Sequence, residues 1–377
     1  MRPDDLVKVH ITEAPEGLEW ACGMDFSLPM GFLVESGLHD SLNGSGGLSL
    51  AGHVPRLQPR SDSLRSRAAF TAKKPPQSRF PVSYQKVPPK IRSLIASAIG
   101  RRKRKRVNEW ASFPGWPVDL SADLMEDLSI GPSPFDKEKT HVLLTHDIDS
   151  PEGLKNLPLF LELEESAGAR SINYVVPCAW RHDRARLDSV IARGHEIGVH
   201  GYDHSCVTPF LEGASLRRRV QEAYGVMAPY NVTGYRSPSL LRTKGLLRAL
   251  AGFYEYDSSI PTSGGPFPVP NNGCSSARPF KIEDIREIPL SLPRDGSLLF
   301  LGYSPGEILD IWIDAARRIS LSGGVVVILT HCESRFSGNK TMLGIYEKFL
   351  DHISNVGKYI FSGSEKILKN KSTDAKT

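Results

Sequence analysis

The sequence predicts an α/β fold, and within that class a TIM-like barrel, for the C-terminal two thirds of the chain. From about residue 139 onward, apolar stretches of strand length alternate with amphipathic stretches of helix length. Such alternation is typical of βαβ units, which build a parallel sheet. Seven or eight such units in roughly 240 residues suit a barrel better than an open sheet. A doubly wound open sheet stays an alternative, because no pattern in the sequence marks closure of a barrel.

The individual elements are placed by their hydrophobic periodicity. Strands are expected over residues 141–145, 172–176, 196–199, 232–235, 252–256, 286–288, 325–330 and 359–361. The main helices are expected over residues 151–167, 184–193, 216–224, 305–318 and 341–353.

The first part of the chain lacks this pattern. Residues 1–88 show little periodicity, with a Gly- and Ser-rich stretch at 41–50 and a stretch rich in Pro, Arg and Ser at 55–90. This composition predicts a mostly flexible extension. Residues 89–138 are expected to form a basic amphipathic helix and a structured lead-in that contains two tryptophans. Residues 139–377 are then the predicted catalytic barrel.

The charge of the chain is concentrated in one segment. The 377 residues have a formal net charge of +5, yet residues 51–106 contain 16 Lys and Arg against one acidic residue, Asp62. The segment ends in six consecutive bases, Arg101, Arg102, Lys103, Arg104, Lys105 and Arg106. Behind an amphipathic helix, such a run either docks on an anionic membrane surface or is merely solvated. No specific nucleic acid partner is expected, because these bases lie outside the predicted barrel.

The sequence favours a cytoplasmic location, with peripheral membrane attachment as the alternative. The first residues include Asp4 and Asp5 and lack the apolar stretch of a secretory signal peptide. The five cysteines are scattered and contain no C-x-x-C pair, which is typical of reduced thiols.

Two carboxylates follow the first predicted barrel strand. Asp147 and Asp149 lie in the segment Thr145–Asp149, at the C-terminal end of the strand, where the active sites of such barrels lie. Residues two apart at a strand end point the same way, so both carboxylates can belong to one site. The alternative is that they close a loop or cap the helix that begins near Pro151.

Two histidines follow another strand. His200 ends the strand at 196–199, and His204 comes four residues later. With Asp149 they supply two imidazoles and one carboxylate, a set that leaves open positions on a divalent metal. Zinc is the expected ion, with Co²⁺, Ni²⁺ and Fe²⁺ as alternatives. His195 begins the strand and therefore lies at the opposite end of the barrel, and Asp203 fits a supporting position.

Two further strand ends carry polar groups. Arg236 follows the strand at 232–235 and is either a clamp for a carboxylate or a surface arginine beside a turn. His331 ends a very apolar strand and is a candidate for proton transfer. The neighbouring Cys332 is not expected to be a nucleophile, because adjacent residues on a strand face opposite ways.

These motifs, in this order, resemble those of the polysaccharide deacetylase superfamily, the NodB-homology domain of carbohydrate esterases. The resemblance covers about residues 139–377. It rests on four motifs: Thr145-His146-Asp147-Ile148-Asp149, His200-Gly201-Tyr202-Asp203-His204, Arg236-Ser237-Pro238 and Leu329-Thr330-His331. The first motif is like that of variant members, in which one residue separates the two acids. Gly201 replaces the usual hydroxyl residue, and Ser239 replaces the aromatic residue often found after the proline.

The resemblance implies a distorted (β/α)7 barrel and a metal-dependent hydrolase that removes an N-acetyl group from an amino sugar or acetylated polysaccharide. By the same match, Asp147 is the catalytic base, oriented by Arg236, and His331 is the acid. Asp149, His200 and His204 hold the metal, and the backbone N–H of Ser239 serves the oxyanion. Two alternatives stay open: an allantoinase-like amidohydrolase on the same scaffold, and an inactive carbohydrate-binding barrel.

Overall fold

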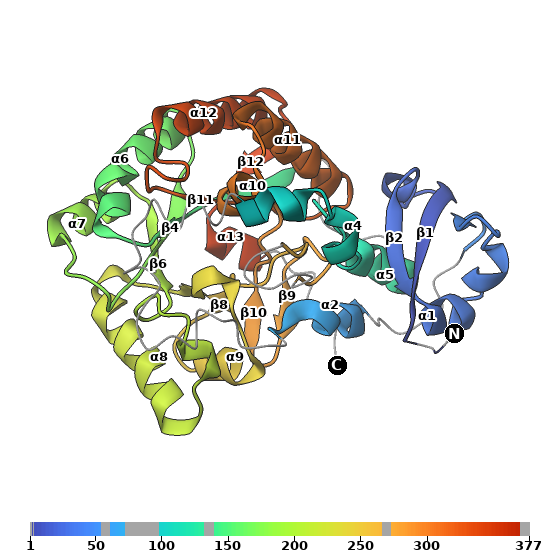
Figure 1. Ribbon diagram of the computed structural model, residues 1–377, viewed down its shortest axis with the longest axis horizontal. Helices are drawn as coiled ribbons and strands as arrows, with labels where there is room; N and C mark the ends of the chain where they lie inside the picture. The colour runs from blue at the N-terminus through green and yellow to red at the C-terminus, as the bar shows by residue number, and fades with distance from the viewer. Residues whose placement is uncertain are drawn as a thin grey trace.

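The computed structural model describes residues 2, 4–53, 61–71, 98–131, 139–265 and 273–369. A large α/β body holds most of these residues, and a smaller sheet lies beside it (Figure 1).

The α/β body is built on one mostly parallel sheet. Its strands are β4 (Thr140–Ile148), β5 (Ser171–Val175), β6 (Glu196–His200), β7 (Gly234–Arg236), β8 (Tyr256–Asp257), β9 (Phe280–Ile282), β10 (Ile285–Glu287), β11 (Val326–His331) and β12 (Tyr359–Phe361). Their order is β11-β4-β5-β6-β7-β8-β10-β9, and β12 also pairs with β4. Among these pairs only β9 and β10 are antiparallel. The expected parallel βαβ arrangement is confirmed.

The sheet curls until the chain after β10 meets β11. The N–H of Leu292 donates to the carbonyl oxygen of Val327 (3.0 Å), and the N–H of Val327 donates to Oγ of Ser291 (2.7 Å). These hydrogen bonds join the two ends of the curled sheet, although no regular β-ladder forms between them. The distorted barrel is therefore confirmed, and the open doubly wound sheet is not observed among the described residues.

Helices surround the barrel sheet (Figure 1). They are α6 (Pro151–Ser166), α7 (Arg184–Ala192), α8 (Gly213–Met227), α9 (Lys244–Leu250), α10 (Asp295–Leu301), α11 (Pro305–Leu321), α12 (Lys340–Asn355) and α13 (Ser364–Lys369). The five helices predicted from periodicity are confirmed, whereas α10 and the short β9 were not expected. The strand predicted over 252–256 is wrong except for its last residue. There the N–H of Phe253 donates to the carbonyl oxygen of Leu250 in the turn after α9 (2.8 Å), and β8 begins only at Tyr256.

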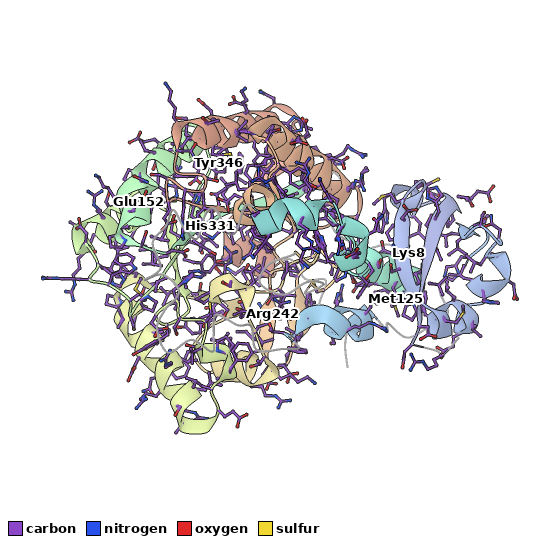
Figure 2. All side chains as sticks on the ribbon, in the orientation of Figure 1. Lys8, Met125, Glu152, Arg242, His331 and Tyr346 are labelled. Atoms are coloured by element: carbon purple, nitrogen blue, oxygen red, sulfur yellow. The ribbon has the colours of Figure 1, made fainter. Side chains whose placement is uncertain are left out.

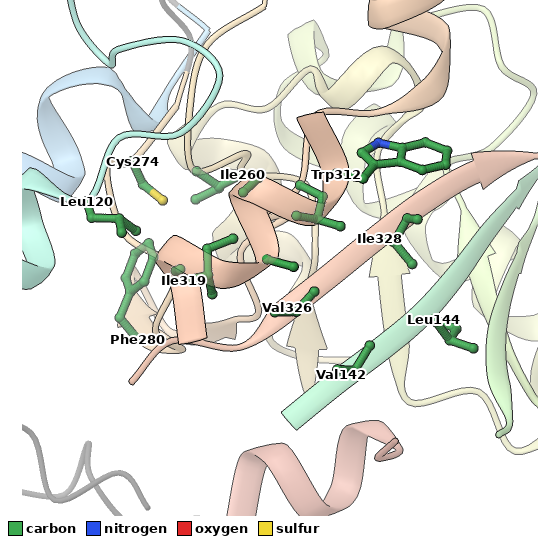
Figure 3. Packing of buried hydrophobic residues seen from close by; sticks show 14 of the residues in the cluster. Leu120, Val142, Leu144, Ile260, Cys274, Phe280, Trp312, Ile319, Val326 and Ile328 are labelled. Carbon is green, nitrogen blue, oxygen red and sulfur yellow. The ribbon is translucent and has the colours of Figure 1, made fainter. Parts of the chain in front are cut away.

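Alternate side chains of the barrel strands belong to two different apolar clusters. Val142 and Leu144 on β4 and Val326 and Ile328 on β11 belong to one buried cluster, which also contains Trp312 and Ile319 of α11 (Figure 3). Leu143 and the inward residues of the other strands form a separate cluster inside the barrel, joined by Ile367 of α13. This alternation, which follows from the pleat of a strand, decides which side chains can reach the interior.

The expectation of a mostly flexible extension over residues 1–88 is wrong for residues 4–53. They contain β1 (Leu6–Glu13), β2 (Asp25–Pro29), α1 (Met30–Glu35) and β3 (Gly47–Ser49), in a sheet of order β2-β1-β3. Apolar side chains such as Ile11, Leu28 and Leu48 are fully buried in the same cluster as the outer barrel core. A sheet this small becomes stable because it packs against another element, which local periodicity does not show. Residues 54–60 and 72–88 lie outside the described residues.

Helix α5 (Ser121–Ile130) lies between the small sheet and the barrel. The indole N–H of Trp20 donates to Asp127 Oδ2 (3.2 Å), and the Arg278 guanidinium of the barrel binds the same carboxylate (2.6 and 2.8 Å). Arg65, on α2 (Ser61–Ala69), binds Glu126 of α5 (2.6 Å). The N-terminal region is thus tied to the barrel through buried charge pairs.

Part of the predicted basic helix also contacts the barrel. Residues 98–104 are helical, and α4 (Val107–Trp110) follows. The Arg104 guanidinium donates to the Gly302 carbonyl oxygen (2.9 Å), binds Glu307 (2.5 Å) and lies 4.0 Å from the centre of the Tyr303 ring. Residues 89–97, the first part of the predicted amphipathic helix, lie outside the described residues, and membrane docking stays a prediction. Within the described ranges, no helix has the length and apolar character needed to cross a membrane.

Candidate functional site

Strand β4 directs Asp147 toward the barrel interior. Thr145 and Asp147 share the inward side of the strand with Leu143, whereas His146 points outward and contacts Glu164 of α6 (2.6 Å). Helix α6 is capped by the Ser150 side chain, which accepts the N–H of Gly153 (3.3 Å). The alternative that the two aspartates serve only as a cap is therefore not supported.

Asp149, His200 and His204 meet at one point, at the C-terminal ends of β4 and β6. Their potential ligand atoms lie within 4.8 Å of one another, and all three side chains are buried. Asp149 Oδ1 is 3.4 Å from His200 Nε2 and 3.2 Å from His204 Nε2. The structure thus brings together the three predicted ligands, whose role in metal binding stays a prediction.

The protonation of His200 suits a cation at this point. His200 Nδ1 lies 3.0 Å from the backbone carbonyl oxygen of Arg236, which can only accept a hydrogen bond. When the ring is neutral, as metal binding requires, its proton is therefore on Nδ1 and the lone pair of Nε2 faces Asp149.

Asp149 supplies a matching anionic group. Its buried Oδ1 atom has no hydrogen-bond partner among the described residues. Burial alone would raise the pKa of Asp149, but His204 and His200 hold it well below its usual value, so the carboxyl is ionised. An unpaired buried carboxylate oxygen beside imidazole nitrogens is costly unless a cation binds there. These three residues fit Zn²⁺ or a similar divalent ion.

Arg236 fixes Asp147 beside this cluster. The guanidinium donates to Asp147 Oδ1 (3.1 Å) and Thr145 Oγ1 (2.8 Å), and two further bonds hold it to the carbonyl oxygen and Oγ of Ser258 (both 2.9 Å). Arg236 is fully buried over the ring of Tyr174 (4.1 Å), so it is not a surface arginine. Burial raises the pKa of Asp147, but His200 and Arg236 outweigh this effect and lower it. Its second oxygen, Oδ2, lies 3.6 Å from His200 Nε2.

His331 is held by a residue that the sequence interpretation missed. His331 Nδ1 lies 2.7 Å from Asp295 Oδ1, and the His331 backbone N–H donates to Asp295 Oδ2 (2.8 Å). Asp295 is fully buried, and Oδ2 also accepts Ser337 Oγ–H (2.7 Å). Burial lowers the pKa of His331, but Asp295 outweighs it and raises the pKa to about 9. A sequence signal existed, because Asp295 follows the predicted strand at 286–288 and so lies at the same end of the barrel.

Ser239 lies on the turn after Arg236, in a strained backbone conformation. Its φ is +55°, and Leu240 (+57°) and His204 (+57°) also have positive φ, which is costly for residues other than glycine. A Cβ at Gly201 would lie 2.3 Å from Pro238 Cδ, so the two loops pack too closely for the hydroxyl residue that is usual in the motif. The role of the Ser239 N–H toward an oxyanion stays a prediction.

The remaining polar residues named from the sequence lie outside this group. Asp203 pairs with Arg219 (3.3 Å), and His195 contacts Glu165 (3.2 Å) at the other end of β6. Cys332 is fully buried, and burial raises the pKa of its thiol well above the usual value, so it is not a nucleophile. Figure 2 shows His331 within the ring of barrel helices, away from the small N-terminal sheet that carries Lys8.

A large cavity lies away from this site. A cavity of about 1020 Å³ lies between the small sheet, residues 107–119 and the end of α11, and none of the predicted site residues lines it. A smaller cavity is lined by Ser239, together with Trp116, Arg242 and Arg294. The clustered side chains, rather than cavity size, therefore locate the candidate site.

Comparison with solved structures identifies the class of fold. The chain shares its fold with solved structures assigned as polysaccharide deacetylases. A protein from Mycobacterium smegmatis assigned as a polysaccharide deacetylase is 18% identical, with a TM-score of 0.52, over 62% of this chain and 90% of that one. A Pseudomonas aeruginosa protein assigned in the same way is 15% identical, with a TM-score of 0.52, over 67% and 96%.

A third similar structure is the Puue allantoinase, which is 15% identical, with a TM-score of 0.53, over 67% of this chain and 96% of its own. Identities this low show a shared fold, and the resemblance found in the sequence is confirmed at that level. A scan against family models and a search of curated proteins each found no match.

Proposed function

We propose that the protein is a metal-dependent hydrolase that removes an N-acetyl group from an amino sugar or an acetylated polysaccharide. One observation carries the proposal: a single end of the barrel holds a buried Asp149–His200–His204 cluster, an Asp147–Arg236 pair and a His331–Asp295 pair. These are the metal ligands, the base and the acid that amide hydrolysis requires.

The three ligands would hold one divalent ion, most suitably Zn²⁺. When bound there, such an ion polarises the acyl carbonyl and lowers the pKa of water. Asp147, kept ionised by Arg236, accepts the proton of the attacking water. The backbone N–H of Ser239 donates to the oxygen that becomes negative in the transition state.

His331 completes the reaction by protonating the leaving nitrogen. An amine leaves an amide readily only when it is protonated, and a raised pKa keeps His331 protonated at neutral pH. Asp295 holds the imidazole with Nδ1 bound, which directs Nε2 away from that carboxylate. The acid, His331, thus comes from β11 and the base, Asp147, comes from β4. These two strands are paired, and His331 lies opposite Asp147 in their register.

A second candidate is the hydrolysis of a cyclic amide, because a solved allantoinase shares this fold. Hydrolysis of either amide uses an acid and a base, so the side chains at this end of the barrel do not separate the two reactions. A catalytically inactive carbohydrate-binding barrel is the least consistent alternative, since all six predicted groups are present.

The deciding experiment measures acetate release from chitin oligosaccharides and, in parallel, ring opening of allantoin. The wild-type protein is assayed as purified, after chelation and dialysis, and after return of Zn²⁺ or Co²⁺. We expect acetate release that is lost on chelation and restored by metal. Full activity after metal removal would contradict the metal mechanism, and ring opening without acetate release would favour the second candidate.

A further inference from the structure

A buried carboxylate that the proposed reaction does not use lies next to the metal-binding cluster. Glu333 is 3% exposed and follows β11 by two residues. Its Oε1 atom accepts the backbone N–H of Asp149 (3.1 Å) and the hydroxyl of Ser150 (2.7 Å). The carboxylate therefore contacts both Asp149 and the residue that follows it.

These contacts matter because β4 ends at Ile148. Asp149 lies one residue beyond the strand, so the parallel ladder that fixes Asp147 does not extend to it. A backbone outside a ladder needs another partner for its N–H, and here Glu333 supplies it. The orientation of the Asp149 carboxylate then depends on the place of Glu333.

Two flanking hydrogen bonds hold Glu333 itself against α6. The Asn156 side-chain amide donates to the carbonyl oxygen of Cys332 (3.0 Å), and the N–H of Ser334 donates to Glu152 Oε1 (3.0 Å). The segment that leaves β11 is thus joined to the first turns of α6 on both sides of Glu333. Glu333 binds the backbone N–H of Asp149, whereas Glu152 lies mainly on the surface.

Gly153 makes this arrangement possible. A Cβ at that position would lie 2.5 Å from Glu333 Oε1, and real side chains do not approach so closely. Glycine is less favourable than alanine in a helix, so its presence here agrees with the close approach of the Glu333 carboxylate.

We propose that Glu333 is a positioning residue that holds the Asp149 carboxylate toward His200 and His204. The inference rests on the metal centre of the proposed function and needs no particular substrate. Partners that orient metal ligands typically change metal affinity by about 10–100-fold when they are removed. Glu333 acts as a hydrogen-bond acceptor in this role, so glutamine can replace it.

The test measures the Kd of Co²⁺, and the visible absorption of the bound ion, for the full-length protein without substrate. We expect Glu333→Ala to weaken Co²⁺ binding by about 10–100-fold and to alter the spectrum. Glu333→Gln keeps the acceptor and is expected to stay within about threefold of the wild type. The matched control Glu196→Ala is expected to do the same, because the Glu196 carboxylate binds Ser364 at the opposite end of the barrel. Thermal unfolding of each metal-free variant checks that it folds.

Gly153→Ala tests the same contact from the opposite side. Alanine favours the helix, yet its Cβ displaces the Glu333 carboxylate, so we expect weaker Co²⁺ binding without loss of helix. A wild-type Kd and spectrum in both Glu333→Ala and Gly153→Ala would overturn the proposal, as would a Glu333→Gln variant as weak as Glu333→Ala. Absence of deacetylase activity with normal Co²⁺ binding would contradict the proposed function alone, whereas a wild-type protein that binds no Co²⁺ would contradict both.

Discussion

The carboxylate of Asp295 binds His331 twice, through the imidazole Nδ1 (2.7 Å) and through the backbone N–H (2.8 Å). The two residues are separated by 36 positions, and helix α11 lies between them in the chain. This double contact fixes both the direction of the ring and its protonation, so it determines whether His331 can act as an acid.

Replacing Asp295 by Asn should change the pH dependence of the reaction. Asp295 raises the pKa of His331 to about 9, so the proposed acid stays protonated until the pH rises through about 9. Without the Asp295 charge the pKa falls, and the alkaline limb of the kcat profile should move to lower pH. A kcat profile from pH 6 to 10 measures this shift, and an unchanged alkaline limb would contradict the role of Asp295.

The same pair makes a contribution to stability with a defined sign. A histidine with a raised folded pKa stabilises the protein fully below its unfolded pKa, about 6.5, and this contribution is lost as the pH rises toward 9. The difference in unfolding free energy between the wild type and Asp295→Asn should therefore shrink between pH 6.5 and 9. Urea unfolding of the metal-free proteins at several pH values provides the measurement.

Mutations should distinguish the metal-binding residues from the catalytic residues by their effects on metal content and on kcat. Asp147→Asn and His331→Ala remove only the base or the acid, so kcat should fall by about 10²–10⁴-fold while metal content is kept. His200→Ala removes a ligand and should lose the metal itself. Metal analysis of dialysed proteins, run beside the activity assay, distinguishes the two results; loss of metal from Asp147→Asn would place that residue among the ligands.

The buried ion pair between Arg278 and Asp127 should be important for joining α5 to the barrel. Arg278→Met leaves the Asp127 carboxylate buried without its guanidinium, and breaking such a pair typically costs about 3–5 kcal/mol. Arg317→Met is the matched control, because its pair with Asp314 is solvent-exposed and worth about 0–1 kcal/mol. Urea denaturation should show a large loss for the first variant only, and equal losses would contradict the structural role.

Membrane docking by the basic run can be tested by co-sedimentation with vesicles that contain anionic lipid. Arg104 already binds Glu307, so the bases expected to reach lipid are the exposed Arg101, Arg102, Lys105 and Arg106. Changing these four to Ser should reduce sedimentation, and the effect should weaken at high salt. Equal sedimentation of the wild type and the four-Ser variant would contradict the membrane hypothesis.

Much of the candidate site could be predicted from the sequence because its residues end apolar strands. Parallel strands in a barrel place their C-terminal ends at one rim, so the polar residues that follow β4, β6, β7 and β11 are brought together by topology alone. The potential ligand atoms of Asp149, His200 and His204 accordingly lie within 4.8 Å of one another. The motif order also indicated the fold that the solved structures share.

The sequence by itself therefore determined most of the strands, the main helices and the six polar groups at the rim, because periodicity and strand ends are local properties of the chain. The tertiary structure alone decided the partners of those groups, Asp295 for His331 and Glu333 for Asp149, since both pairs form between distant segments. It also decided that residues 4–53 fold. Their small sheet buries its apolar face in a core shared with α5 and the barrel, and such contacts leave no local pattern.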